Sequence, residues 1–282
     1  MTAISVRGLR KSYDGVEAVR GIDFEVAAGE VFGLLGPNGA GKTTTVEILE
    51  GYRKRDAGEV SVLGFDPGRR ERALRARIGV VLQSSELWPN LTPAETVRMF
   101  AGYYPKARPV DEVVELVGLA EKADARVKTL SGGQKRRLDL ALALVGDPDL
   151  IFMDEPTTGF DPQARRAAWE MIRGLRALGK TILLTTHYLD EAQQLADRVG
   201  VLRNGSLVTV GTPAELVGSQ LTEIRYRANG EPVVERTETP TRRLNELTGA
   251  ALAEGRELDE IEVRRASLED VYLDLLDEDA DA

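Results

Sequence analysis

The chain has 282 residues, of which 42% are hydrophobic, and its 37 basic and 46 acidic side chains give a formal net charge of −9. It has no cysteine and a single histidine, His187, which excludes disulfides, a thiol nucleophile and a zinc site with several imidazole ligands. Any metal is therefore expected to have oxygen ligands. No apolar run approaches the roughly 18 residues of a membrane span, and the N-terminal stretch lacks a signal-peptide pattern, so we expect a cytoplasmic protein unless a partner ties it to a membrane.

The charge is distributed unevenly along the chain. Residues 1–217 carry 29 basic and 29 acidic side chains, whereas residues 218–282 carry 8 and 17, so the whole imbalance (8 − 17 = −9) lies in the last segment. This change in composition predicts a domain boundary after residue 217. The charge balance also argues against a nucleic-acid partner, and we interpret the basic cluster RRERALRAR at 69–77 as a solvated helix face.

Short apolar runs alternate with helical patterns through the first 217 residues. We expect strands at 30–36, 77–83, 149–155, 180–187 and 197–205, which predicts an α/β fold with a largely parallel sheet. The stretch from 92 to about 146 is typical of helices alone. Its first helix is expected to begin with Thr92 as N-cap, Pro93 in the first turn and Glu95 completing a capping box.

The strongest motif, GPNGAGKTT at 36–44, follows the first of these strands and matches the phosphate-binding pattern G-x-x-x-x-G-K-[ST]. Glycine lets backbone N–H groups approach phosphate oxygens closely, and the helix expected near Gly41 points its positive end at the same anion. Lys42 adds a charge toward the β and γ phosphates, and Thr43 offers a hydroxyl to Mg²⁺. A glycine-rich turn with a chance lysine is the alternative, which the strand–loop–helix context disfavours. The predicted nucleotide-binding residues here are Gly36, Pro37, Asn38, Gly39, Ala40, Gly41, Lys42, Thr43 and Thr44.

A second motif, LSGGQ at 130–134, opens a helical pattern. Ser131 is expected to be its N-cap, with Gln134 closing the capping box. A capped helix start would explain this much. Gly132 and Gly133 reduce helix stability, however, and they suit a site where a phosphate lies against bare backbone.

Two further signals are expected at the ligand-binding edge of the sheet. LIFMDE at 150–155 predicts a buried strand that ends in Asp154, which can hold Mg²⁺, and Glu155, which can accept a proton from an attacking water. His187 follows the strand at 180–187, and a neutral imidazole there can donate a hydrogen bond to the γ phosphate. The alternatives are a solvated loop start for the two acids and a histidine satisfied by backbone groups.

Taken in chain order, these motifs resemble the ATPase subunit of ABC transporters over residues 1 to about 217. The resemblance also includes Tyr13 in KSYDG, Gln83 in VVLQ and Asp161 in TTGFDP. It implies ATP and Mg²⁺ as cofactors, stacking of Tyr13 on adenine, a magnesium and sensing role for Gln83, and action of Asp161 across a dimer interface. It also makes His187 the switch histidine. In isolation Tyr13 would be an edge-strand aromatic, Gln83 a strand-end polar residue and Asp161 a turn aspartate.

The resemblance implies an architecture and an assembly. We expect a P-loop NTPase fold of the ABC type, α/β with a helical subdomain at about 88–146, plus a small acidic C-terminal α+β domain at 218–282. A head-to-tail homodimer is implied, in which LSGGQ of one protomer covers the nucleotide of the other. A separate integral membrane permease is implied as well, with this chain bound peripherally at the cytoplasmic face. Phe160 departs from the family, which more often has leucine there.

The C-terminal segment bears on the subfamily. In RRASLEDVYLDLL at 264–276, Ser267 is a candidate N-cap followed by Asp270 and apolar residues, and the segment resembles bacterial exporter ATPases of the daunorubicin-resistance type. An ordinary terminal amphipathic helix is the alternative. The resemblance implies export of drugs, antibiotics or lipid-like compounds. Two alternative functions are disfavoured: a chromosome-organising ATPase would need a long coiled coil before LSGGQ, and an ABC-type translation factor would need two cassettes in one chain. A nucleotide-dependent switch without transport stays open as a third alternative.

Overall fold

The computed structural model describes residues 1–81, 86–217, 222–228, 230–255, 258–265 and 272. They form two compact units, one within Met1–Val210 and the other within Gly211–Ala282. The division falls ahead of the boundary expected after Val217. No helix in the described ranges combines the length and the apolar character that crossing a bilayer requires.

A six-stranded sheet forms the centre of the first unit, in the order β5-β6-β7-β3-β8-β9. The pairs β5–β6, β6–β7, β7–β3 and β3–β8 are all parallel, which confirms the predicted α/β fold. Each of the five strands expected in this region is present. The bounds are β3 Val31–Leu35, β5 Ile78–Val81, β6 Leu150–Asp154, β7 Thr181–Thr186, β8 Arg198–Arg203 and β9 Ser206–Gly211.

The central strands are mostly apolar because each of their faces packs against a core. Alternate side chains of β3, β6 and β7 enter opposite cores, as expected for a parallel sheet that is covered on both sides. One core receives Phe32, Leu34, Phe152 and Leu183. The other receives Val31, Ile151, Met153, Ile182 and Leu184.

A three-stranded antiparallel sheet, which the sequence analysis did not predict, covers the first of these cores. Its order is β2-β1-β4, with β1 Thr2–Tyr13, β2 Val16–Ala27 and β4 Ala57–Val62. The β1–β2 hairpin turns at Asp14 and Gly15, both with positive φ, and pairs Tyr13 with Val16. The hairpin therefore fixes the position of Tyr13 at the end of β1.

The helical region packs into the second core through α3 Pro93–Ala101, α4 Val110–Leu116 and α5 Gly132–Leu144. Both predicted capping boxes are confirmed. The Thr92 hydroxyl accepts from the Glu95 N–H at 3.2 Å, and the Ser131 hydroxyl accepts from the Gln134 N–H at 3.2 Å. These caps fix where α3 and α5 begin, and so where the LSGGQ segment lies.

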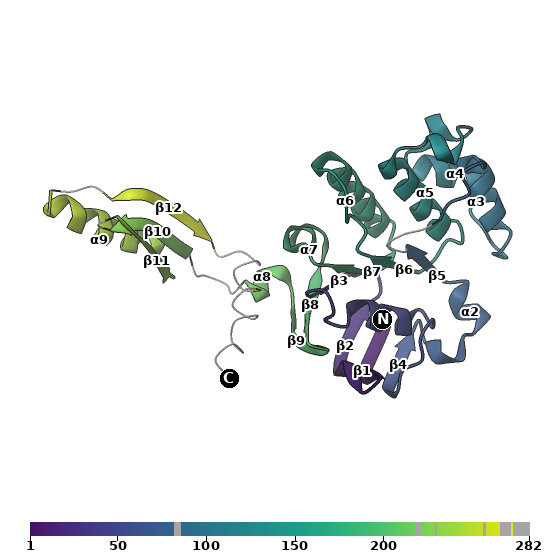
Figure 1. Cartoon of the computed structure of the whole chain (residues 1–282), viewed down its shortest axis with the longest axis horizontal. Helices are drawn as coiled ribbons and strands as arrows, with labels where there is room; N and C mark the ends of the chain where they lie inside the picture. Colours follow the sequence, from purple (N-terminus) through teal and green to yellow (C-terminus); the bar gives the residue numbers. More distant parts are fainter. Residues whose placement is uncertain (82–85, 218–221, 229, 256–257, 266–271, 273–282) are drawn as a thin grey trace. The chain divides into compact units, whose positions relative to one another are not determined.

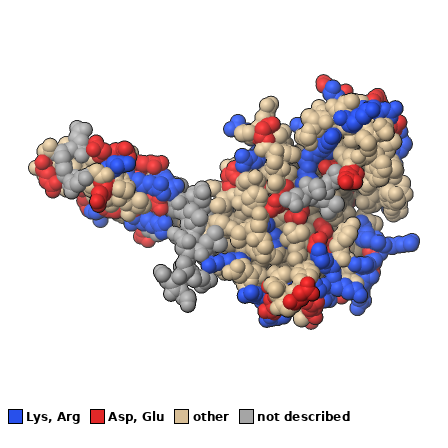
Figure 2. All heavy atoms as spheres, in the orientation of Figure 1, with Lys and Arg blue, Asp and Glu red and all other residues tan. Residues whose placement is uncertain are grey.

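The remaining helices of this unit are α1 Lys42–Leu49, α2 Arg72–Arg75, α6 Pro162–Ala177 and α7 Leu189–Leu195, with short 3-10 turns at Pro67–Arg69, Ala120–Lys122 and Val127–Thr129. Of these helices, α6 and α7 connect strands of the central sheet, whereas α1 and α2 flank β4 of the antiparallel sheet. Within the basic cluster 69–77 the arginines are exposed while Leu74 is buried, and of these arginines Arg72 and Arg75 lie in α2. On the face drawn in Figure 2, basic and acidic side chains lie side by side.

The second unit is a small α+β assembly. An antiparallel sheet in the order β11-β10-β12 is accompanied by helix α9, and the short α8 precedes them. The bounds are α8 Pro213–Leu216, β10 Thr222–Ala228, β11 Glu231–Thr237, α9 Pro240–Ala253 and β12 Asp259–Arg265. The helix predicted from Ser267 onward lies outside the described residues.

Candidate active site

The glycine-rich loop joins β3 to α1 and wraps around the ammonium group of Lys42. Lys42 Nζ donates to the carbonyl oxygens of Gly36 at 2.7 Å and Pro37 at 3.1 Å. Gly41, the residue before α1, has a φ of 101°, and a Cβ there would lie 2.4 Å from the Ala18 carbonyl oxygen. Only glycine fits that backbone, so the loop has the conformation that the phosphate-binding pattern requires.

The acidic end of β6 is held by a single hydroxyl of the neighbouring strand. Thr185 Oγ1 donates to Asp154 Oδ1 and accepts from the backbone N–H of Glu155 at 3.0 Å. Glu155 has a φ of 46°, in the left-handed region that a non-glycine residue enters only at a cost of roughly 1–3 kcal/mol. The Glu155 N–H also donates to the Thr185 carbonyl at 3.2 Å, so both acceptors that hold the strained residue belong to Thr185.

Lys42, Glu155 and His187 converge at the end of these strands. Glu155 Oε1 lies 3.8 Å from Lys42 Nζ and 3.1 Å from His187 Nδ1. The side chain of Lys42 is 5% exposed and that of Glu155 12%, while His187 is more open at 35%. Burial lowers the pKa of Lys42, and the nearby carboxylates of Glu155 and Asp154 act in the opposite direction.

These groups open into one cavity of about 600 Å³. Tyr13 lies at the border of this cavity. The ammonium of Lys11 and the guanidinium of Arg53 each lie 5.3 Å from the centre of the Tyr13 ring. The cavity therefore combines an aromatic ring, the phosphate loop, an acid and an imidazole. Its lining residues are Tyr13, Ala18, Asn38, Gly39, Gly41, Lys42, Thr43, Thr44, Glu155, Thr158 and His187.

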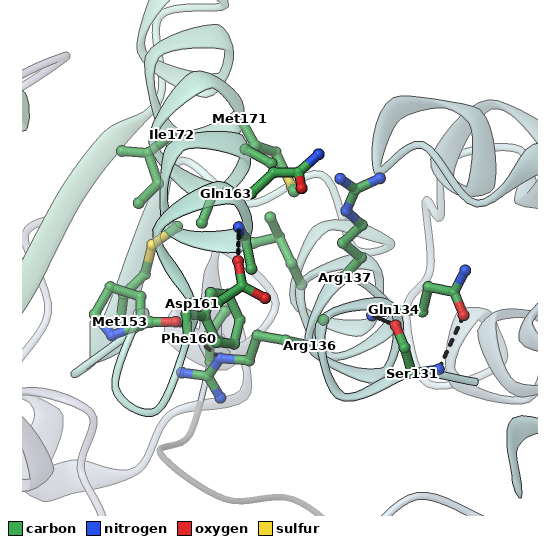
Figure 3. A pocket seen from close by; sticks show the side chains of 17 residues that line it. Ser131, Gln134, Arg136, Arg137, Met153, Phe160, Asp161, Gln163, Met171 and Ile172 are labelled. Atoms are coloured by element: carbon green, nitrogen blue, oxygen red, sulfur yellow. Dashed lines mark hydrogen bonds between the residues drawn. The ribbon is translucent and has the colours of Figure 1, made fainter. Parts of the chain in front are cut away.

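The LSGGQ segment and Asp161 line a different cavity, of about 330 Å³, between α5 and α6 (Figure 3). Ser131, Gly133 and Gln134 border it from α5, and Asp161 borders it from the start of α6. Asp161 is the N-cap of α6 and accepts from the Ala164 N–H at 2.8 Å. One protomer thus keeps the predicted site residues in two groups. Gln83 lies outside the described residues.

Sequence reasoning did not single out two threonines that organise the first cavity. Thr185 holds both acids, and Thr158 Oγ1 donates to Glu155 Oε2 at 3.2 Å. Thr158 stands inside the motif TTGFDP and Thr185 inside the strand expected at 180–187, but a hydroxyl in a strand or a turn carries no local sign of its partner. Their contacts become visible only when β6 and β7 are paired.

The residues present fit a magnesium nucleotide. Thr43 lines the cavity and Asp154 ends β6, next in sequence to the lining residue Glu155, and both side chains carry oxygen donors of the kind that Mg²⁺ prefers. Within the described ranges no three His, Asp or Glu side chains are grouped as a metal cage. An ion held here would complete its coordination with phosphate and water oxygens, as is usual for Mg²⁺ in nucleotide hydrolases.

The fold and site define a P-loop nucleotide hydrolase, and comparison with known proteins identifies its family. Residues 19–158 match the family described as ABC transporter. The chain is 44% identical to Nod factor export ATP-binding protein I of Paraburkholderia xenovorans, over 97% of this chain and 96% of the relative. A protein of the same name from a Rhizobium species is also 44% identical, with the same coverage of both chains. The chain belongs to the ABC transporter family and is an ATP-hydrolysing subunit of that family.

Solved structures agree with this assignment. An ATP-binding subunit of an ABC transporter matches with a TM-score of 0.72 and 25% identity, over 97% of this chain and 99% of that chain. A dimeric ATP-binding cassette in a post-hydrolysis state, bound to ADP and Pi, matches with a TM-score of 0.66 and 25% identity, over 74% and 98%. The relatives described above are named for Nod factor export and not for daunorubicin resistance.

We expect Gly41→Ala to weaken ATP binding by at least about tenfold, because a Cβ would meet the Ala18 carbonyl and the strained backbone costs on the order of 1–3 kcal/mol. Gly179→Ala is the matched control: its φ is +77° and a Cβ would meet no described atom within 4 Å. Titration with a fluorescent ATP analogue measures affinity, and thermal unfolding checks the fold. Equal affinities for both folded variants would contradict the prediction.

Proposed function

We propose that this chain powers an ABC exporter by binding and hydrolysing ATP at a head-to-tail dimer interface, on the cytoplasmic face of the membrane. The convergence of Lys42, Glu155 and His187 at the end of the phosphate loop is the observation that carries the proposed catalytic roles. The name of the relatives, Nod factor export ATP-binding protein, supports export as the direction of transport. The proposal does not extend to a drug-exporter subtype.

Glu155 is the proposed general base. Glu155 lines the cavity, where its carboxylate can accept a proton from a water that attacks the γ phosphate. Lys42 would offset charge on the phosphates, and Mg²⁺, when bound through Thr43 and Asp154, would neutralise charge that develops during phosphoryl transfer. Tyr13 would stack on the adenine ring.

His187 is proposed to orient the base. Its Nδ1 lies 3.1 Å from Glu155 Oε1, a distance at which an Nδ1–H donates to the carboxylate. A neutral imidazole in that tautomer has no proton on Nε2 and cannot donate from there to a phosphate. A hydrogen bond from His187 to the γ phosphate therefore needs either the imidazolium or release of the Glu155 contact.

The two separate cavities support a shared active site. Ser131 and Asp161 line one cavity, whereas the phosphate loop lines the other, so the groups can complete one site only if different protomers supply them. The matching cassette that was solved as a dimer bound to ADP and Pi supports the same arrangement. ATP would then join the two subunits, and its hydrolysis would release them.

An exposed aromatic group on the helical region supports a separate membrane partner. Trp88, Phe100 and Tyr103 form edge-to-face pairs with ring centres 6.1 Å and 5.9 Å apart. Trp88 is 48% and Tyr103 76% exposed, and neighbouring Met99 is 36% exposed. Adjacent exposed apolar side chains are typical of protein contact surfaces. We propose that this aromatic group contacts the permease.

Glu155→Gln should keep ATP binding and lose about 100-fold or more in turnover, the usual contribution of a general base. It should also accumulate an ATP-bound dimer, because release follows hydrolysis. Glu170→Gln is the control, since Glu170 is an exposed acid on α6 whose side chain is 74% exposed. Phosphate release and gel filtration with ATP measure the two effects. Turnover by Glu155→Gln at the rate of Glu170→Gln would remove Glu155 as the base.

Mixing Lys42→Ala and Ser131→Arg proteins should restore ATPase activity that neither has alone. In the mixed dimer both lesions fall on one composite site, and the other site keeps an intact Lys42 and an intact Ser131. Nucleotide occlusion is measured beside turnover, so that one competent site is detected even if hydrolysis needs two. Verified mixed dimers with neither activity nor occlusion would refute the head-to-tail arrangement.

The double variant Trp88→Ser, Tyr103→Ser should co-purify less of a multi-span membrane protein than the unmodified chain does. The chain is purified from detergent-extracted membranes of its source cells, and the co-purified protein is identified by mass spectrometry. Tyr52→Ser is the matched control, because Tyr52 is an aromatic residue that is 69% exposed and stands apart from this group in the sequence. Recovery of no multi-span protein with the unmodified chain would instead favour a nucleotide-dependent switch without transport. Equal recovery by all variants would exclude the aromatic group from the contact.

A further inference from the structure

A carboxylate behind the active site is completely buried. Glu191 lies in the first turn of α7, shortly after His187, and is 0% exposed. Its Oε1 accepts from Thr157 Oγ1 at 2.9 Å and from Trp169 Nε1 at 3.3 Å. Removing a carboxylate from water costs several kcal/mol unless hydrogen bonds compensate, so a side chain of this kind calls for an explanation beyond filling space.

The partners of Glu191 belong to two other segments of the site. Thr157 is 1% exposed and stands in the turn that carries Glu155 toward Asp161, and Trp169 lies on α6, which that turn enters. The turn after β6 and the segment after β7, which carries Glu191, also meet where His187 Nδ1 contacts Glu155 Oε1 at 3.1 Å. The turn after β6 and the segment after β7 are therefore joined twice, once at the reacting groups and once behind them.

These contacts between the two segments matter because the turn after β6 begins with a strained residue, Glu155. Glu155 has a φ of 46°, and backbone in this region persists only where surrounding contacts hold it. Thr185 holds its N–H, and Glu191 holds the hydroxyl of Thr157 just beyond it. Glu191 does not line the nucleotide cavity, so it would act through these contacts and not on substrate.

We propose that Glu191 is a positioning residue for ATP hydrolysis: through Thr157 it holds the turn after β6 against α7, so that the Glu155 carboxylate and the His187 imidazole keep their contact. The inference rests on the proposed roles of Glu155 and His187. Burial raises the pKa of Glu191, while hydrogen bonds from Thr186, Thr157 and Trp169 act in the opposite direction. Glutamine, whose amide oxygen can accept the same two hydrogen bonds, is thus the conservative replacement.

The test uses Trp169 as its reporter. The chain has two tryptophans, so all variants are built on Trp88→Phe and compared with that protein. Glu191→Ala should lower kcat about 10- to 100-fold, the effect of displacing a reacting group by about 1 Å, and leave KM for ATP within about threefold. The emission maximum of Trp169 should change as its N–H loses the carboxylate acceptor. Glu191→Gln should retain both the turnover and the emission.

Thr157→Val keeps the test decisive if Glu191→Ala does not fold, because valine has the shape of threonine and lacks the hydroxyl. It should lower kcat in the same direction, and thermal unfolding is measured to show that the variant is folded at the assay temperature. Reference turnover by either folded variant would overturn the proposal, as would equal loss in Glu191→Gln and Glu191→Ala. Glu155→Gln is measured in parallel. Normal turnover by Glu155→Gln would refute Glu155 as the proposed base. Slow turnover by Glu155→Gln together with normal turnover by Glu191→Ala would refute only the role of Glu191.

Discussion

Parallel pairing of β6, β7 and β3 is the interaction on which the active site depends. Backbone register places Asp154 opposite Thr185 and Leu35 opposite Thr186, so the three strands end at one edge of the sheet. The residue or loop that follows each strand begins at that edge, which is where open α/β sheets bind ligands. The phosphate loop, Glu155 and the histidine thus meet without long connecting loops, although they are far apart in the sequence.

Electrostatics then adapt this edge to a polyphosphate. Lys42 is 5% exposed, and burial of its ammonium is unfavourable, as the lowered pKa shows. Glu155 and Asp154 offset part of that cost, and an anionic ligand would supply further compensation. The loop therefore presents a cation that is already desolvated and oriented. The Thr185 hydroxyl contacts the Asp154 carboxylate and the Glu155 backbone N–H, and so helps to fix both residues without adding charge.

The sequence predicted the parts of the fold whose signals are local. Continuous apolar runs indicated the central strands, and the capping boxes at Thr92 and Ser131 indicated where two helices begin. The antiparallel sheet was missed although Ile22, Phe24 and Val26 are buried at alternate positions, partly because register shifts in β1 interrupt its period. Contacts such as those of Glu191 could not be predicted, because their partners lie on other elements and no spacing along the chain encodes them.

Capping and ligand binding are compatible at the start of α5. Ser131 caps the helix by accepting from the Gln134 N–H, which leaves the N–H groups of the first two helical residues without an intrahelical acceptor. Those residues are Gly132 and Gly133, and around Gly132 no described atom lies within 4 Å of where a Cβ would stand. Two backbone donors at a positive helix end are thus open to an anion from outside the protomer. In the proposed head-to-tail dimer, the glycines that weaken this helix would let a nucleotide phosphate approach its backbone closely.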